Sequence, residues 1–253
     1  MKAVRALVTV AVLVGLWQMV VTVGGLPHFI LPSPARVAGT LVERAPLVAW
    51  HALYTITEIV LGLGLGAVLG GISALTLAQF RPARRWLLPL LVVSQAIPVF
   101  ALAPILVLWL GYGMTSKVAM ATLVIYFPVT SAFYDGLRRT DPGWLELART
   151  MNGPAWRVLW HVRLPAALPA FASGLRVAAA VAPIGAVIGE WVGASAGLGF
   201  LMLHSNARMQ TDLMFAALVV LAGLAVTLYV VVDTVLRRLL PWQPETLTTQ
   251  EGD

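Results

Sequence analysis

The sequence predicts an all-α integral membrane protein with six spanning helices. Hydrophobic residues make up 59% of the 253-residue chain and charged residues 11%, whereas soluble domains have about 45–50% and ~25%. Six apolar segments reach the length of roughly 20 residues that a helix needs to cross the hydrocarbon layer. The basic residues lie at the ends of these segments rather than along one polar face, which indicates membrane orientation and argues against nucleic acid binding.

The six segments lie near residues 5–23, 52–79, 86–110, 118–134, 168–189 and 212–235. Lys2 and Arg5 precede the first segment, so a secretory signal is the alternative to a retained span. The apolar core that begins at Leu7 is long, and no small-residue cleavage site follows before Pro27. We therefore expect a retained span, one transmembrane domain over residues 1–240, and a polar tail over 241–253.

The positive charges predict the orientation of the bundle. If the N-terminus lies in the cytoplasm, the outer segments hold four basic residues, namely Arg36, Arg44, Lys117 and Arg208. Arg176 stays within the fifth segment, and the inner segments hold Lys2, Arg5, Arg81, Arg84, Arg85, Arg138, Arg139, Arg149, Arg157, Arg163, Arg237 and Arg238. This bias predicts that both termini are cytoplasmic, together with the loop over residues 135–165.

That loop is the most informative stretch of the chain, because it is basic and half polar between two apolar segments. Its markers are Glu146, Ala148, Arg149, Asn152, Gly153, Leu164 and Pro165. Asn tolerates a left-handed backbone better than other non-glycine residues, and a glycine follows it here. We therefore expect a tight turn between two short helices, in a loop that docks a partner protein.

The third segment carries Pro98 and Pro104, each of which removes a backbone donor and crowds the preceding turn. The segment should be kinked or opened there, and it should face the interior of the bundle, because free carbonyls are not tolerated against lipid. Gln95, one turn before Pro98, is the polar side chain expected to line a solute pathway. The alternative is that the prolines only shape helix packing.

The second and fifth segments add further candidates. Gly62, Gly66 and Gly70 recur every four residues on one face, which suits the close approach of another helix. Glu58 either lines a cavity or lies at the outer interface. Glu190 and Trp191 either contact a polar heterocycle near the outer mouth, or form an interfacial tryptophan belt with a solvated carboxylate.

Nothing in the sequence predicts catalysis. The chain has no cysteine, and its four histidines, at 28, 51, 161 and 204, lack metal-ligand spacing. No nucleophile elbow or close pair of carboxylates occurs within a span. We therefore expect no catalytic residue, no metal and no cofactor.

Three motifs resemble one protein family. The 146–165 loop is similar to the "EAA" loop of ABC importer permeases, although Leu147 stands where a second Ala is usual and Asn152 where Gly is usual. Pro98-x-x-Ala-Leu-x-Pro104 with Trp109-x-Gly-x-Gly113 resembles the third-helix pattern of the nitrate, sulfonate and taurine subfamily. Glu190-x-x-Gly-x-x-x-Gly-Leu-Gly199 resembles that subfamily as well.

The resemblance implies a type I permease in a bacterial inner membrane, working with ABC ATPase subunits, a second permease copy and an external substrate-binding protein. The loop would dock the ATPase, and this chain would hydrolyse nothing itself. Subfamily solutes are nitrate, sulfonates, taurine and pyrimidine precursors of thiamine. Acidic groups at Glu58 and Glu190 favour a neutral or weakly basic heterocycle, because they would repel a sulfonate. The alternatives are a proton- or ion-coupled secondary transporter using Glu58 or Glu190, and a membrane-bound enzyme or scaffold.

Overall fold

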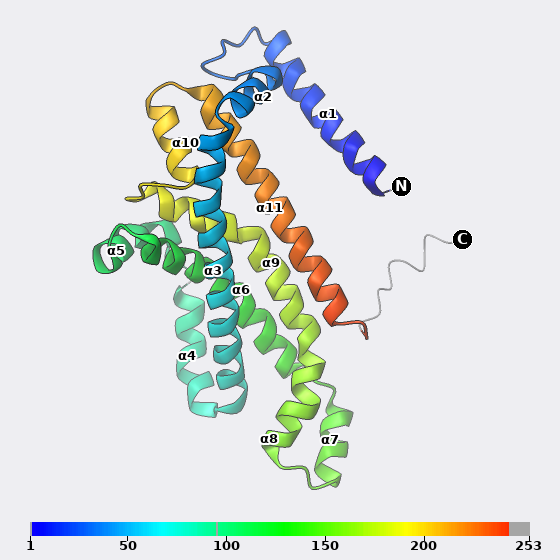
Figure 1. The fold of residues 1–253 in the computed structure, drawn as a ribbon. Coiled ribbons are helices and arrows are strands. Elements are labelled where there is room, and N and C mark those ends of the chain that lie inside the picture. Colours follow the sequence, from blue (N-terminus) through cyan, green and yellow to red (C-terminus); the bar gives the residue numbers. More distant parts are fainter. Residues whose placement is uncertain (1, 95, 243–253) are drawn as a thin grey trace.

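The computed structural model describes residues 2–94 and 96–242, and these residues fold into helices joined by short connections (Figure 1). The long helices are α3 (Ala45–Gln79), α6 (Met114–Arg138), α9 (Leu164–Trp191) and α11 (Thr211–Leu239). The shorter elements are α1 (Lys2–Val23), α2 (Pro34–Glu43), α4 (Arg81–Ser94), α5 (Val99–Leu110), α7 (Pro142–Thr150), α8 (Ala155–Val158), the π-helix η1 (Leu159–Arg163) and α10 (Leu198–Ala207).

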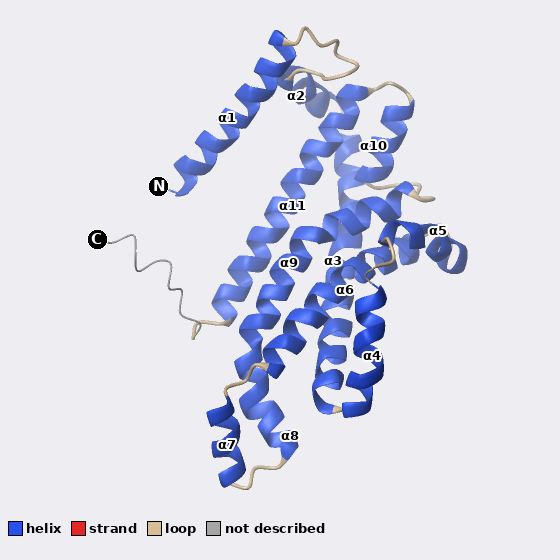
Figure 2. Cartoon of the chain, turned by 180° about the vertical axis from the view of Figure 1, so that it is seen from behind, coloured by secondary structure: helices blue, strands red, loops and turns tan. Residues whose placement is uncertain are grey.

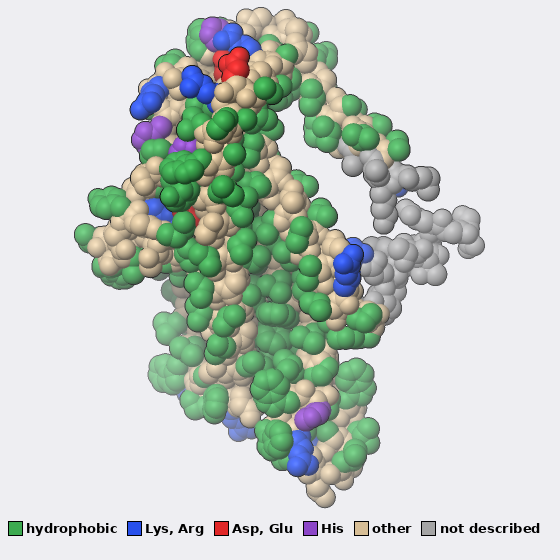
Figure 3. All heavy atoms as spheres, viewed as in Figure 1, with side chains coloured by type: hydrophobic (Ala, Val, Ile, Leu, Met, Phe, Trp, Pro, Cys, Tyr) green, Lys and Arg blue, Asp and Glu red, His purple; other side chains and the backbone are tan. Residues whose placement is uncertain are grey.

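The six predicted apolar segments correspond to these helices. Four helical stretches are long and apolar enough to cross a membrane, namely 45–79, 114–138, 155–191 and 211–239. The pair α4 and α5 provides a fifth span if it is counted as one broken segment, and residues 7–23 of α1 form a shorter apolar helix. Most of the charged side chains visible in Figure 3 lie toward the two ends of the long helices, and the surface between them is largely hydrophobic.

Helix α6 lies between α3 and α9 at the centre of the fold, and small residues allow this close packing (Figure 1). A Cβ atom on Gly62 would lie 2.5 Å from the Cβ of Ala121, and one on Gly66 would lie 2.5 Å from Cγ2 of Ile125. Gly70 faces Val129 in the same way, at 3.0 Å. The three glycines of α3 therefore lie against α6, where a larger side chain would separate the helices.

The third predicted segment is broken, and its position differs from the expectation. Helix α4 ends at Ser94 and α5 begins after Pro98, with a bend of 103° between them. Pro104 lies inside α5 without interrupting it. The expected interior position is wrong for the single chain, because no residue of α4 is buried and only two of α5 are. Gln95, expected to line a pathway, is outside the described residues.

Helix α11 packs beside α9 (Figure 2), and charged side chains connect the two helices. Nε of Arg176 on α9 donates to Oδ1 of Asp233 on α11 across 2.6 Å, and Arg237 donates to the other oxygen of Asp233 at 2.8 Å. Charges within a membrane span are tolerated when they are paired. Arg176 therefore joins α9 to α11.

Candidate functional site

The loop that the sequence singles out is built from α7, α8 and η1, and it extends beyond the ends of the long helices (Figure 1). Asp141 begins α7, where its Oδ1 accepts a hydrogen bond from the Gly143 amide at 2.7 Å. Pro142 follows as the first helical residue, a position that tolerates the missing N–H group. Both features fix the start of α7 without help from the rest of the fold.

The end of α7 is a tight turn at Asn152, whose φ is 53°. The Asn152 amide donates to the carbonyl of Arg149, and the Gly153 amide donates to the carbonyl of Ala148, both at 2.9 Å. This pair of bonds is the Schellman arrangement, with Asn in the position usually held by Gly. A Cβ atom on Gly153 would lie 3.0 Å from the Ala148 oxygen, so glycine suits this site.

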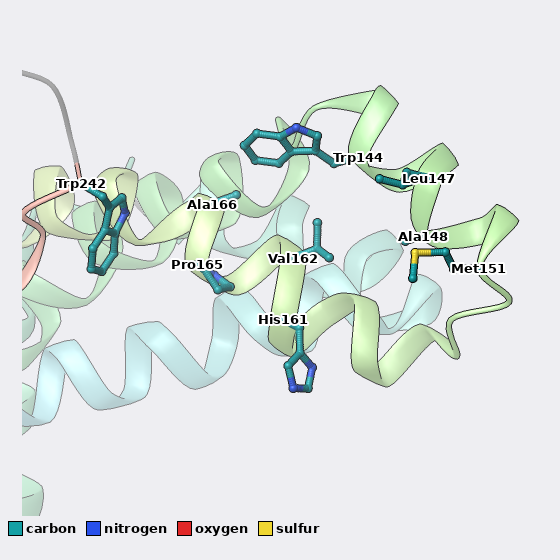
Figure 4. A pocket seen from close by; sticks show the side chains of 9 residues that line it. All are labelled: Trp144, Leu147, Ala148, Met151, His161, Val162, Pro165, Ala166 and Trp242. Atoms are coloured by element: carbon teal, nitrogen blue, oxygen red, sulfur yellow. The ribbon is translucent and has the colours of Figure 1, made fainter.

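The outward surface of α7 is apolar and exposed. Trp144, Leu147 and Met151 are 55%, 61% and 75% exposed, and the charged side chains of Glu146 and Arg149 are exposed beside them. A hollow of about 460 Å³ lies between α7 and the start of α9 (Figure 4). It is lined by Trp144, Leu147, Ala148, Met151, His161, Val162, Pro165, Ala166 and Trp242.

The return from the loop into α9 is anchored to the core. Arg163 donates through Nε and Nη2 to the carbonyl of Leu137 on α6, at 3.2 and 2.9 Å. Leu164 packs against the buried cluster that includes Leu77 and Leu159. The π-helix η1, which ends at Arg163, links α8 to α9, and such segments often occur at functional sites. The motif comparison identified Leu164 and Pro165 but missed Arg163.

At the opposite end of the long helices, Glu190 is buried, with 1% of its surface exposed. The Thr55 hydroxyl donates to Oε1 of Glu190 at 2.6 Å, and the amides of Gly199 and Phe200 donate to Oε2. These amides belong to the first turn of α10, where backbone donors have no partner within the helix. Glu190 thus caps α10, and the alternative of a solvated carboxylate is wrong.

Two residues of α3 complete this cap. The Gly197 amide donates to Nδ1 of His51 at 3.1 Å, and the Leu198 amide donates to Oγ1 of Thr55 at 2.8 Å. Gly197 has a φ of 113°, and a Cβ atom there would overlap the Glu190 carboxyl group. Sequence reasoning missed His51 and Thr55, although their spacing with Glu58 at i, i+4 and i+7 places all three on one helix face.

Lys117 is buried close to this cap. The charge pattern assigns it to an outer connecting segment, but only 2% of it is exposed. Its Nζ donates to the carbonyls of Gly193, Val192 and Tyr112 at 3.1, 3.3 and 3.4 Å. It also lies 3.2 Å from Oγ of Ser116. Lys117 therefore ties α6 to the 192–197 connection, and it cannot serve as an exposed marker of topology.

Glu58 lies within the same cluster and interacts electrostatically with Glu190 and Lys117. It is 2% exposed, and no donor among the described residues bonds to its Oε2, so protein encloses the Glu58 side chain. Glu58 lines a cavity of about 130 Å³. The residues that line this cavity do not include Pro98, Pro104 or Trp191, and Trp191 is 51% exposed. The structure thus brings Glu58 and Glu190 together, whereas Pro98, Pro104 and Trp191 do not line this cavity.

Three relatives match this chain over almost its whole length. A "Probable ABC transporter permease protein" of Haemophilus influenzae is 57% identical, covering 94% of this chain and 98% of its own. The riboflavin transport system permease protein RibX of Chloroflexus aurantiacus is 38% identical, covering 93% and 89%. The formylaminopyrimidine transport permease protein ThiX of Halalkalibacterium halodurans is 36% identical, covering 90% and 91%.

The fold is also similar to a solved structure, that of the MetNI methionine ABC transporter in inward-facing conformations. The match has a TM-score of 0.64 and 20% identity, and it covers 74% of this chain and 93% of that one. Residues 62–243, more than half of the chain, match the family described as binding-protein-dependent transport system inner membrane component. The chain therefore belongs to this family, the permease subunits of ABC transporters.

Proposed function

We propose that this permease imports a small heterocyclic solute, delivered by an external binding protein and driven by separate ATPase subunits that dock on α7. The observation that carries the proposal is the apolar surface of Trp144, Leu147 and Met151, held on an anchored helical loop. An exposed apolar patch of this kind suits a protein interface. In this scheme the chain hydrolyses no ATP and supplies the path and the coupling.

The anchors of the loop support a coupling role. Arg163 bonds to the end of α6, and η1 continues directly into α9. A displacement of α7 by closing ATPases would therefore act on two central helices at once, rather than being absorbed by a flexible connection. The charge distribution supports placing α7 in the cytoplasm and the α2 and α10 end outside.

A second copy of the chain is the proposed partner within the membrane. Helices α4 and α5 expose Trp86, Phe100, Leu108 and Trp109, each by more than 60%. The two prolines and the bend between α4 and α5 lie in this face. Its burial against a symmetric partner would enclose the solute pathway between the copies, with Pro98 and Pro104 on its wall and Trp191 toward its outer mouth.

The favoured solute is a pyrimidine related to thiamine precursors. The relatives named for formylaminopyrimidine and riboflavin support a heteroaromatic solute. The taurine transport system permease protein of Escherichia coli is 31% identical, so sulfonates are the competing class of solute. The cluster close to the proposed outer end offers a sulfonate no free cation, because it holds two carboxyl groups and a lysine that already donates to backbone carbonyls.

The test is uptake by proteoliposomes that contain the permease, its ATPase and its binding protein. We expect ATP-dependent accumulation of formylaminopyrimidine, with little competition from excess taurine. Accumulation of taurine in place of the pyrimidine would overturn the proposed solute. Accumulation driven by a proton gradient without ATP would support the secondary transporter instead.

A further inference from the structure

We infer that the cavity lined by Glu58 binds the amino-bearing edge of a single-ring heterocycle, with Glu58 as the acceptor of its N–H group. This inference rests on the proposed function and assigns the solute a contact inside the permease. The cavity lies between α3, the start of α6 and the 192–197 connection. Its lining residues are Tyr54, Glu58, Tyr112, Gly113, Met114, Lys117, Ala194, Ser195 and Ala196.

The hydrogen-bonding groups of the cavity favour a ligand that carries a hydrogen-bond donor. Lys117 directs its Nζ to three backbone carbonyls and the Ser116 hydroxyl, so it has no N–H group left to attract an anion. The Glu58 carboxyl group forms part of the cavity wall and is hydrogen-bonded to the Glu190 carboxyl group. Its Oε2 is enclosed by protein, and no donor among the described residues bonds to it. An amino group on the ligand would supply a donor to this carboxyl group.

The volume of the cavity favours a ligand with a single ring. Its volume is about 130 Å³, and a cavity of ~150 Å³ in another protein is enough to hold benzene. The cavity is slightly smaller than that reference, so a single six-membered ring would enter with its amino edge toward Glu58, and its opposite edge and substituents would extend toward the opening. The three fused rings of a flavin would not fit.

Two aromatic side chains, Tyr54 and Tyr112, line the cavity. The Tyr54 ring packs at a tilt of 57° against the Trp50 ring, with ring centroids 4.8 Å apart. Tyr112 lies over Gly193, where a Cβ atom would come within 2.6 Å of its ring. Gly193 has a φ of 71°, so the connection can pass this close to the ring only with glycine there. These two rings offer flat apolar faces to a planar ligand.

The experiment compares two probes on the assembled permease and ATPase in nanodiscs, without the binding protein. The probes are 4-amino-2-methylpyrimidine and 2-methylpyrimidine, and their dissociation constants are measured by saturation-transfer NMR. We expect the amino ring to bind about tenfold more tightly to the wild-type complex. Glu58→Leu should abolish this preference. Glu43→Leu removes an exposed carboxyl group from α2 and should leave the preference unchanged.

Equal affinity of the wild-type complex for the two probes would overturn the inference. This comparison uses only the wild-type protein, so it does not depend on whether a variant folds. An unchanged preference in an assembled Glu58→Leu complex would also overturn it. Uptake separates this failure from failure of the proposed function. If the wild-type system and Glu58→Leu import the aminopyrimidine equally, the function stands and the site does not. If the wild-type system imports no aminopyrimidine, the proposed solute and this site are both wrong.

Discussion

Thr55 on α3 and Glu190 at the end of α9 share a hydrogen bond of 2.6 Å, although 135 positions separate them in the chain. The same Thr55 oxygen accepts from the Leu198 amide at the start of α10. One hydroxyl group thus acts as donor to one element and acceptor from another, which fixes the angle at which α10 leaves α9. The connection held in this way forms one wall of the cavity beside Glu58.

Thr55→Val should destabilise the fold. The substitution keeps the shape of the side chain but leaves the Leu198 amide and one Glu190 oxygen without a partner, at about 1–3 kcal/mol for each buried group. The measurement is thermal unfolding in detergent. Thr57→Val is the matched control, because Thr57 is exposed and bonds only to a carbonyl of its own helix. Equal losses in the two variants would contradict the capping role of Thr55.

Glu190→Leu should lower stability far more than Glu58→Leu. Removal of Glu190 leaves the amides of Gly199 and Phe200 unpaired in a buried site, so the free energy of unfolding should fall by about 2–4 kcal/mol. Removal of Glu58 takes away an Oε2 atom to which no donor of the described residues bonds, so stability should stay within ~1 kcal/mol or rise. Unfolding of the purified chain measures both. A greater loss in Glu58→Leu would reverse the roles assigned here.

Leu147→Asp should reduce ATPase binding without preventing membrane insertion. The residue is 61% exposed on the proposed docking face, so a charge there costs the fold little but opposes an apolar contact. The measurement is co-purification of the ATPase and uptake per inserted permease, and both should fall at least tenfold. Val42→Asp on α2 is the control, since Val42 is 77% exposed at the opposite end.

Gly153→Pro tests the turn that ends α7. Proline removes the amide that bonds to Ala148 and crowds Asn152, so the turn cannot form as observed. We expect the same loss of ATPase binding as in Leu147→Asp, again with normal insertion. Full ATPase binding and uptake in this variant would exclude the turn as part of the coupling element.

Single cysteines test the orientation, because the chain has no native cysteine. Positions 44 and 208 should react with a membrane-impermeant thiol reagent in intact spheroplasts, whereas 84 and 139 should react only after lysis. All four native side chains are exposed in the fold. Position 117 is unsuitable because Lys117 is buried. Labelling of position 139 in sealed cells would place α7 outside and exclude the docking proposal.

The sequence by itself determined the features that depend on neighbouring residues. Apolar length predicts the spans, and the i+4 spacing of Gly62, Gly66 and Gly70 predicts the face that lies against α6. Proline chemistry predicts a break in the third segment at Pro98, and the backbone tolerance of Asn predicts the turn at position 152. Each of these follows from forces that act within a few turns of one helix.

The tertiary structure alone decided which polar groups inside the membrane region meet. Thr55 donates a hydrogen bond to Glu190. Lys117 donates to the carbonyl of Val192, 75 positions away in the chain, and Arg176 donates to Asp233, 57 positions away. Such pairs depend on the rotation of each helix about its axis, which the packing of α3, α6 and α9 sets. In apolar surroundings an unpaired charge is costly, so packing and polar pairing must be satisfied together. No local sequence pattern specifies the helix arrangement that satisfies both packing and polar pairing.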